Sequence, residues 1–267
     1  MNSWNMYWRY ILMSIKAQMQ YRVSFFLSAL GQLAATGIEV AGIWALFTRF
    51  GNLDNWTIAE VCLFYGVVNI TFSLADALST GFDVFGPAYV RTGNFDRLLL
   101  RPRSTVLQLL GHELALRRIG RFTQGLIVFI WACLQLQLQW GMGDVGLLLF
   151  SIVGGICLFF GLIVIQATLS FWTIESLEIM NTMTYGGVQT AQYPLDIYEP
   201  WFRKFFTYIV PLACVSYFPI VHILHIADPL GSPEWLQVSS PVAGLFFLFF
   251  SLALFQFGQR HYTSTGN

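Results

Sequence analysis

Five long apolar runs constrain this chain more than any other feature. They cover Val23–Phe47, Ile58–Phe82, Phe122–Gln139, Val145–Trp172 and Val242–Gly258. A helix of about 20 apolar residues crosses the roughly 30 Å hydrocarbon core of a bilayer, so each run predicts a membrane-spanning helix. We therefore expect an all-α polytopic membrane protein, with residues 1–267 forming a single transmembrane domain.

Composition argues against soluble proteins and nucleic-acid binders. Only 10% of the residues are charged, whereas soluble domains carry about 25%. The 14 basic residues balance the 14 acidic ones, so the chain lacks the basic field that binds nucleic acid. Lys16 and Lys204 are followed by Ala17 and Phe205, so neither lysine ends a phosphate-binding loop. We expect no catalytic, cofactor or metal site on this chain, and any ATP hydrolysis on a separate chain.

The segment Thr173–Trp235 allows two interpretations. In the first, Phe205–Ala227 is the fifth of six spans and Glu175–Lys204 is a cytoplasmic loop. In the second, Ser176–Gln192 is the fifth span and Trp201–Ala227 folds back as a re-entrant hairpin. Hydropathy alone favours the first interpretation, and both give six spans.

The N-terminal residues and the cations indicate how the chain lies in the membrane. Apolar residues recur at helical spacing before the first run, at Trp4, Trp8, Ile11, Leu12, Ile15 and Met19. They predict an interfacial amphipathic helix, and a frayed tail is the alternative. Eleven of the fourteen lysines and arginines fall before the first run, between the second and third runs, or near the C-terminus. Because Lys and Arg in short loops stay inside, we expect both termini to be cytoplasmic.

The segment Gly93–Pro102, between the second and third runs, reads Gly-Asn-Phe-Asp-Arg-Leu-Leu-Leu-Arg-Pro. A turn-forming glycine, charged residues and a leucine triplet ended by proline predict a short amphipathic helix exposed on the cytoplasmic face. Ser104 is placed to cap the helix that follows. Such a helix needs a hydrophobic partner for Leu98 and Leu99, so we expect docking to another protein. Contact of the arginines with anionic lipid is the alternative.

Two ionisable residues, Glu39 and Asp76, fall inside the first two runs. Each costs on the order of 3 kcal/mol if it is unpaired at the bilayer centre. No basic residue is expected at matching depth, so these residues indicate either a polar contact between helices or proton coupling. His222 and His225 lie one helical turn apart before Asp228, which is a weak metal-binding pattern, and interfacial histidines are the plainer interpretation.

With six spans, an interfacial helix and an arginine-rich loop, the chain resembles the membrane permease subunits of type-2 ATP-binding cassette (ABC) exporters. The most specific similarity lies in Gly93–Pro102, in Tyr193-Pro-Leu-Asp-Ile-Tyr198 with Trp201-Phe-Arg203, and in Ile209-Val-Pro211. These motifs are most similar to a bacterial branch in which two different permeases share one ATPase.

The resemblance implies partners and a location. It places Gly93, Phe95, Asp96, Arg97, Leu98, Leu99, Arg101 and Pro102 in a coupling helix seated on a cytoplasmic ABC ATPase. Two copies of that ATPase would hold ATP and Mg²⁺, and the second permease would be a different homologous chain. The complex would lie among the lipids of the bacterial inner membrane.

The resemblance also implies a transport path and selects one topology. An amphipathic or hydrophobic substrate would be exported along a path near Glu39 and Asp76. Pro194–Ile226 would re-enter the membrane as short helices, and Pro211 and Pro219 suit a broken hairpin. We therefore adopt the second interpretation, with a re-entrant segment before the last span. An ion- or proton-coupled secondary transporter is the alternative function.

Overall fold

The computed structural model describes residues 13, 16, 20, 22–53, 55–111, 118–173 and 177–264. Within these residues the chain is built from helices joined by short linkers. The longer helices are α2 (Arg22–Phe50), α3 (Ile58–Asp83), α6 (Ile119–Leu136), α7 (Met142–Leu169), α8 (Leu177–Ala191) and α13 (Val242–Arg260). The shorter ones are α4 (Asn94–Leu99), α5 (Thr105–Leu110), α9 (Pro200–Lys204), α10 (Leu212–Val215), α11 (Tyr217–Ile223) and α12 (Glu234–Ser239).

Five helices are long and apolar enough to cross a membrane, and they correspond to the five predicted runs. They are Val23–Phe50, Ile58–Val90, Ile119–Leu136, Met142–Leu169 and Val242–Arg260. The prediction of an all-α polytopic membrane protein is therefore confirmed. The predicted interfacial helix over Trp4–Met19 lies almost entirely outside the described residues.

Two of these helices begin three residues earlier than hydropathy predicts, because polar residues lie inside their first turns. In α7, Asp144 accepts a hydrogen bond from the backbone N–H of Gly141 at 2.9 Å, so the carboxylate caps its own helix. In α6, Arg121 lies within the first turn and is 8% exposed, because it finds partners on α3. Hydropathy places these charged residues in linkers, whereas the helices include them.

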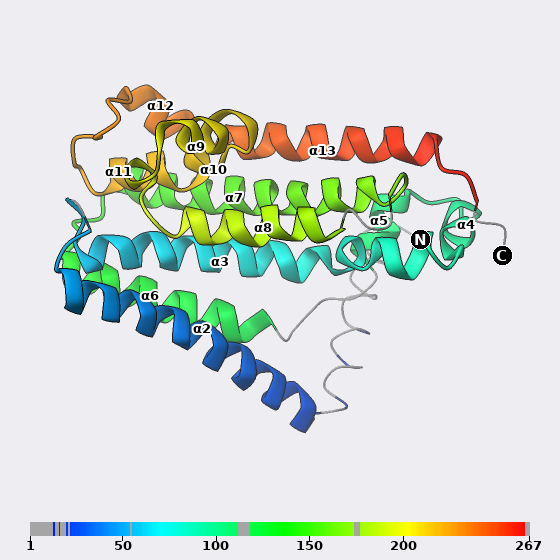
Figure 1. Cartoon of the computed structure of the whole chain (residues 1–267), viewed down its shortest axis with the longest axis horizontal. Helices are drawn as coiled ribbons and strands as arrows, with labels where there is room; N and C mark the ends of the chain where they lie inside the picture. The colour runs from blue at the N-terminus through cyan, green and yellow to red at the C-terminus, as the bar shows by residue number, and fades with distance from the viewer. Residues whose placement is uncertain are drawn as a thin grey trace.

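The helices form a bundle around α3 (Figure 1). Most residues of α3 are buried, and Figure 1 shows α2 and α6 on one side of it and α7, α8 and α13 on the other. The short helices α4 and α5 lie at one end, which we call the α4 end. The helices α9 to α12 lie at the opposite end, which we call the hairpin end.

Small residues bring α7 into close contact with its neighbours. The carbonyl of Gly154 abuts Gly244 of α13, and the methyl group of Thr71 on α3 abuts Gly155. A side chain at either glycine would collide with backbone or with a packed residue, which is how small residues allow membrane helices to approach. Gly154 and Gly155 therefore allow α7 to pack closely against α13 and α3.

The segment after α7 contains a helix beside the bundle and then a bent pair of helices, and the bend fits both a broken span and a re-entrant hairpin. Figure 1 shows α8 lying along the bundle beside α3 and α7, although its 15 residues are fewer than hydropathy rules require for a span. The stretch Pro200–Ile223, which we call the hairpin, is not one straight helix: it bends by 70° between Ile209 and Leu212, at Pro211. Proline lacks the N–H that would continue the helix, so the break falls at this residue.

A bifurcated hydrogen bond at the hairpin end links two segments that are 140 residues apart in the sequence. The indole N–H of Trp56, just before α3, donates to both carboxylate oxygens of Asp196 at 3.0 Å. Trp56 is 2% exposed, and Asp196 lies in the short 3-10 helix Leu195–Ile197 that follows α8. The motif Tyr193–Tyr198 therefore positions the chain between α8 and the hairpin relative to the start of α3.

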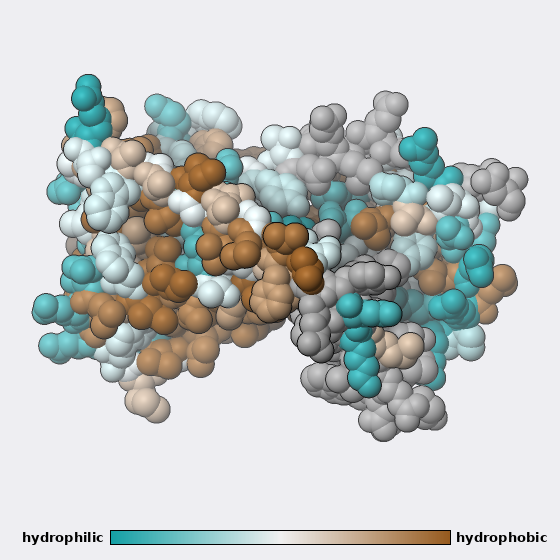
Figure 2. Space-filling view, turned by 90° about the horizontal axis from the view of Figure 1, so that it is seen from below, coloured by the Kyte–Doolittle hydropathy of each residue, from teal (hydrophilic) through white to brown (hydrophobic). Residues whose placement is uncertain are grey.

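The outer surface has the polarity expected of a bundle embedded in a bilayer. Figure 2 shows the face formed by α2 and α6, with hydrophobic residues over its middle and hydrophilic residues gathered towards the two ends. Leu27, Leu30 and Ile38 of α2 are each at least 60% exposed. Apolar side chains in such numbers on a surface indicate contact with lipid or with another membrane helix.

Candidate functional site

The predicted coupling segment forms a short helix outside the bundle. Gly93 adopts the left-handed conformation, with φ +70°, and α4 begins at the next residue. A side chain is strained in that conformation, so glycine allows the sharp turn that reverses the chain after α3. α4 itself has six residues, Asn94–Leu99, and lies at the α4 end with the last residues of α13 (Figure 1). The turn expected at Gly93 is therefore present.

Phe95 anchors α4 to the bundle. Its ring is fully buried and makes edge-on contacts with Phe85, 5.1 Å between centroids, and with Tyr262, 5.0 Å. The ring of Phe171, at the end of α7, lies 5.4 Å away. A buried aromatic cluster of this kind contributes packing energy beyond its area, so α4 is held rigidly against the ends of α3, α7 and α13.

The exposed part of the leucine triplet is shifted by one residue from the sequence prediction. Leu98 was expected to be exposed for contact with a partner protein. It is only 7% exposed, so this expectation is wrong for Leu98. Leu99 is 39% exposed and Leu100 is 85% exposed. The reason is helical geometry: Phe95 and Leu98 share the inward face, Leu99 lies at the edge of that face, and Leu100 lies on the opposite side.

The charged residues of Gly93–Pro102 also differ in exposure. Arg97, Arg101 and Pro102 are exposed beside the two leucines. Asp96 is half-buried, and its carboxylate accepts a hydrogen bond from the hydroxyl of Ser264 at 2.6 Å. Asp96 thus binds the C-terminal segment of its own chain. Ser104 occupies the N-cap position of α5 as expected, but its side chain makes no capping hydrogen bond.

Glu39 of α2 lies in a polar contact among three helices. Its carboxylate accepts a hydrogen bond from the hydroxyl of Tyr65 on α3 at 3.1 Å. The side-chain amide of Gln124 on α6 donates to that same hydroxyl at 3.2 Å and to the backbone carbonyl of Thr36 at 2.8 Å. Glu39 is half-buried, so one side of its carboxylate is satisfied within the protein.

Asp76 of α3 has a basic partner, contrary to the expectation from sequence. The Nε atom of Arg118 lies 2.8 Å from a carboxylate oxygen of Asp76, and Asp76 is 3% exposed. The expectation was wrong because Arg118 immediately precedes α6, and α6 runs beside the part of α3 that carries Asp76. A buried carboxylate is costly without such a pair.

Arg121 is a further buried cation that sequence reasoning placed in a loop. Its Nε donates to the side-chain carbonyl of Asn69 at 2.7 Å, and its guanidinium lies over the ring of Phe72, 4.9 Å from the centroid. These partners come from α3, which carries Asn69, Phe72 and Asp76 on one face at spacings of three and four residues. The three-residue spacing of Arg118, Arg121 and Gln124, which also places them on one helix face, was the available sequence signal.

The histidines lie at the hairpin end. His225 Nε2 is 3.6 Å from the Asp144 carboxylate, and the rings of His222 and His225 are 6.2 Å apart. Asp228 accepts hydrogen bonds from the Tyr217 hydroxyl at 2.7 Å and from the Leu230 and Ser232 backbone N–H groups at 2.9 Å. Burial raises the pKa of Asp228, but hydrogen bonds from Ser232, Tyr217 and Leu230 outweigh burial and hold it below its ordinary value. This carboxylate stabilises a turn.

The fold and the geometry of the α4 end define a helical, multi-pass membrane protein that holds a short, anchored helix outside its bundle. The model of the family described as ABC-2 family transporter protein matches residues 33–266, and the chain belongs to this family. It is therefore a membrane subunit of an ABC transporter, a transport component rather than a catalytic one, and the family implies an ABC ATPase as partner. Neither a curated protein nor a solved structure gives a significant match to the chain.

Proposed function

We propose that this chain is the transmembrane subunit of an ATP-driven exporter that moves an amphipathic or hydrophobic substrate out of the cytoplasm or the inner leaflet. α4 is its coupling helix, and a separate cytoplasmic ABC ATPase docks there. The observation that carries the proposal is the pairing of a buried anchor, Phe95 with Leu98, and an exposed apolar tip, Leu99 with Leu100, on one short helix. A rigid connection and a small hydrophobic contact are what transmission of movement between two subunits requires.

The charge distribution supports a cytoplasmic location for the α4 end. Arg91, Arg97, Arg101 and Arg103 are all exposed there. At the hairpin end Asp228 lies in a loop and Glu234 begins α12, and α9 carries Arg203 and Lys204. The excess of cations at the α4 end supports cytoplasmic termini, with the hairpin on the outside of a bacterial inner membrane.

Contacts within the chain connect α4 with the helices that would move. Phe95 contacts Phe85 after α3 and Phe171 after α7, and the Thr105 hydroxyl of α5 donates to the Gln259 side chain of α13 at 2.9 Å. Displacing α4 therefore displaces the ends of three membrane helices together. ATP and Mg²⁺ bind to the ATPase, and this chain receives only the movement.

The complete transporter contains two ATPase copies and two permeases, the second permease being a different homologous chain. Exposed apolar side chains on α2 provide surface for this second permease or for lipid. The substrate path lies along Glu39, Asp76 and α8, as the family resemblance implies. In the present conformation Asp76 is paired with Arg118, so opening this path would require the pair to separate or move aside.

The decisive test is reconstitution with a partner ABC ATPase. Proteoliposomes that hold both proteins are expected to move substrate only when ATP and Mg²⁺ are present on the α4 side. Replacement of Leu100 by cysteine is expected to give a crosslink to that ATPase. Transport by the permease alone, driven by a proton gradient and abolished by Glu39→Gln, would instead support the secondary transporter that the Glu39 contact suggests.

A further inference from the structure

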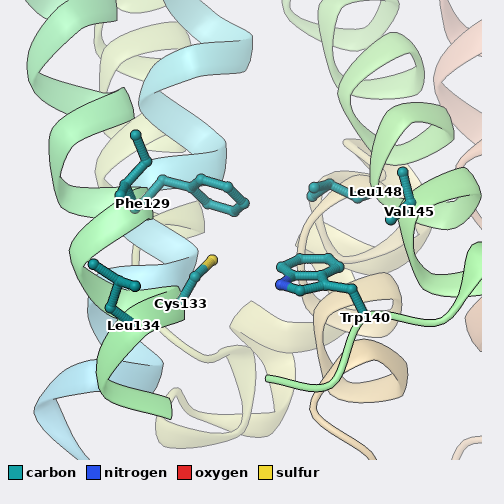
Figure 3. Close-up of a pocket in the computed structure, with 7 residues that line it drawn as sticks. Phe129, Cys133, Leu134, Trp140, Val145 and Leu148 are labelled. Atoms are coloured by element: carbon teal, nitrogen blue, oxygen red, sulfur yellow. The ribbon is translucent and has the colours of Figure 1, made fainter. Parts of the chain in front are cut away.

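An apolar groove opens on the surface between α6 and α7 near the hairpin end (Figure 3). Its volume is about 290 Å³. α6 contributes Phe129, Cys133 and Leu134, α7 contributes Val145 and Leu148, and Trp140 lies in the linker between the two helices. Figure 3 shows Phe129 and Cys133 on one side of an open space and Leu148 and Trp140 on the other. None of the groove residues belongs to the α4 end or to the Glu39 and Asp76 contacts.

The groove exists because α6 and α7 pack on α3 rather than on each other. Gly66 of α3 meets the backbone of Phe129, and Thr71 of α3 meets Gly155 of α7. Both helices are thereby drawn close to the central helix, and Figure 3 shows α3 behind α6. The two helical walls of the groove are therefore set by packing on α3, and Trp140 of the linker completes it.

The groove opens towards the lipid-facing surface. Leu134 is 72% exposed and Ile130 is 49% exposed on the α6 side, and Leu149 is 59% exposed beside the α7 wall. α6 and α7 are both long and apolar enough to span the membrane. The side chains that line this space are apolar except for one indole N–H group, too few partners to hold a water molecule, whereas a hydrocarbon chain gains dispersion contacts with both walls.

One polar group faces this apolar space. The indole nitrogen of Trp140 points from the linker towards the α6 wall, on the side of Cys133 (Figure 3). Indole N–H is a hydrogen-bond donor only, and within the described residues no acceptor is recorded for it. Trp140 lies at the end of the membrane-spanning helices, where lipid head groups begin and tryptophan is favoured.

We propose that the groove binds one acyl chain of a diacyl glycerophospholipid, with the ester carbonyl of that chain accepting a hydrogen bond from Trp140. The chain would lie against Phe129, Val145 and Leu148, and the glycerol would sit at the level of the linker. A membrane helix of another protein offers Trp140 no free backbone acceptor, because its carbonyl groups are hydrogen-bonded within the helix. A hydrocarbon chain with one acceptor at its end matches both the apolar walls and the single donor.

Titration of the purified full-length permease with two lipids, followed by native mass spectrometry, tests this proposal. The lipids are phosphatidylglycerol with ester-linked chains and its ether-linked analogue, which lacks the carbonyl oxygen. One ester lipid is expected to bind per chain, about fivefold more tightly than the ether lipid, because one hydrogen bond is lost with the ether lipid. Trp140→Phe is expected to bind both lipids equally, at the weaker affinity.

A matched pair of valine substitutions tests whether the lipid binds in the groove. Val145→Phe, which fills the groove, is expected to weaken ester-lipid binding at least tenfold. Val153→Phe, two turns further along the exposed surface of α7, is expected to leave it unchanged. Should Val145→Phe fail to fold, the comparison of ester and ether lipids on wild type and Trp140→Phe still decides the question.

Three results would overturn the proposal. Equal affinity of the wild type for ester and ether lipids would remove the role of Trp140. Equal binding by the wild type and both valine variants would mean that lipid only surrounds the protein non-specifically. Displacement of the lipid by a transported substrate at its transport concentration would make the groove a substrate site. None of these results depends on ATPase docking at α4, so the proposed exporter function is tested separately.

Discussion

Replacing Leu99 and Leu100 together by alanine tests the docking role of α4 most directly. Full burial of one leucine contributes about 1.5–3 kcal/mol. Leu99 is 39% exposed and Leu100 is 85% exposed, so a partner can bury an area slightly larger than that of one whole leucine. Alanine retains part of each contact, so we expect docking to weaken by about 2 kcal/mol, or about 30-fold in Kd.

The assay measures the affinity of the ABC ATPase for the permease held in lipid nanodiscs, together with substrate-stimulated ATP hydrolysis. The double variant should lose affinity and stimulation while its thermal unfolding temperature in detergent stays unchanged, because both side chains are on the surface. Leu98→Ala is the matched control. It removes a buried leucine, so it should lower the unfolding temperature through a loss of about 2–5 kcal/mol.

Two outcomes would refute this reasoning. Wild-type affinity and stimulation in the double variant would show that α4 does not dock through its leucine tip. A large fall in unfolding temperature for the double variant, equal to that of Leu98→Ala, would show that the two leucines are packed within the protein rather than presented to a partner.

The remaining predictions concern topology, the buried ion pair and pH. A cysteine in place of Asn94, with the native thiols replaced, should resist an impermeant reagent added outside intact cells and react in inverted vesicles; outside labelling would reverse the assigned topology. Asp76→Asn should destabilise the fold by about 2–4 kcal/mol, because it leaves Arg118 without its partner. In a double-mutant cycle measured by thermal unfolding, adding Arg118→Gln should recover part of this loss. Additive losses would mean that the pair is not coupled. Since folding lowers the pKa of Asp228, its stabilising contribution is complete above the ordinary value of about 3.9 and disappears as pH falls through the folded-state pKa. Tyr217→Phe removes one donor to this carboxylate, so it should flatten the loss of unfolding temperature measured from pH 6 to pH 3, and an unchanged slope would contradict this role.

The sequence alone determined the membrane class, the family and most helix positions, because these depend on local composition. A run such as Ile58–Phe82 forms a helix in a bilayer, because every backbone N–H and C=O group there needs a hydrogen-bond partner within the protein. It matches α3, which covers Ile58–Asp83. The Gly93 turn was also predictable, since a left-handed residue before a short helix favours glycine.

Only the tertiary structure decided which side of each helix is buried and which charges meet. Leu98 and Leu99 are alike in sequence, and the position of Phe95 against Phe85 is what turns one of them inward. Arg118 and Asp76 are 42 positions apart, so their pairing depends on α6 lying beside α3. Contacts between distant segments are set by packing, and no local pattern encodes the distance between two helices. The groove beside Trp140 arises in the same way, because it is the space left where two helices pack on a third.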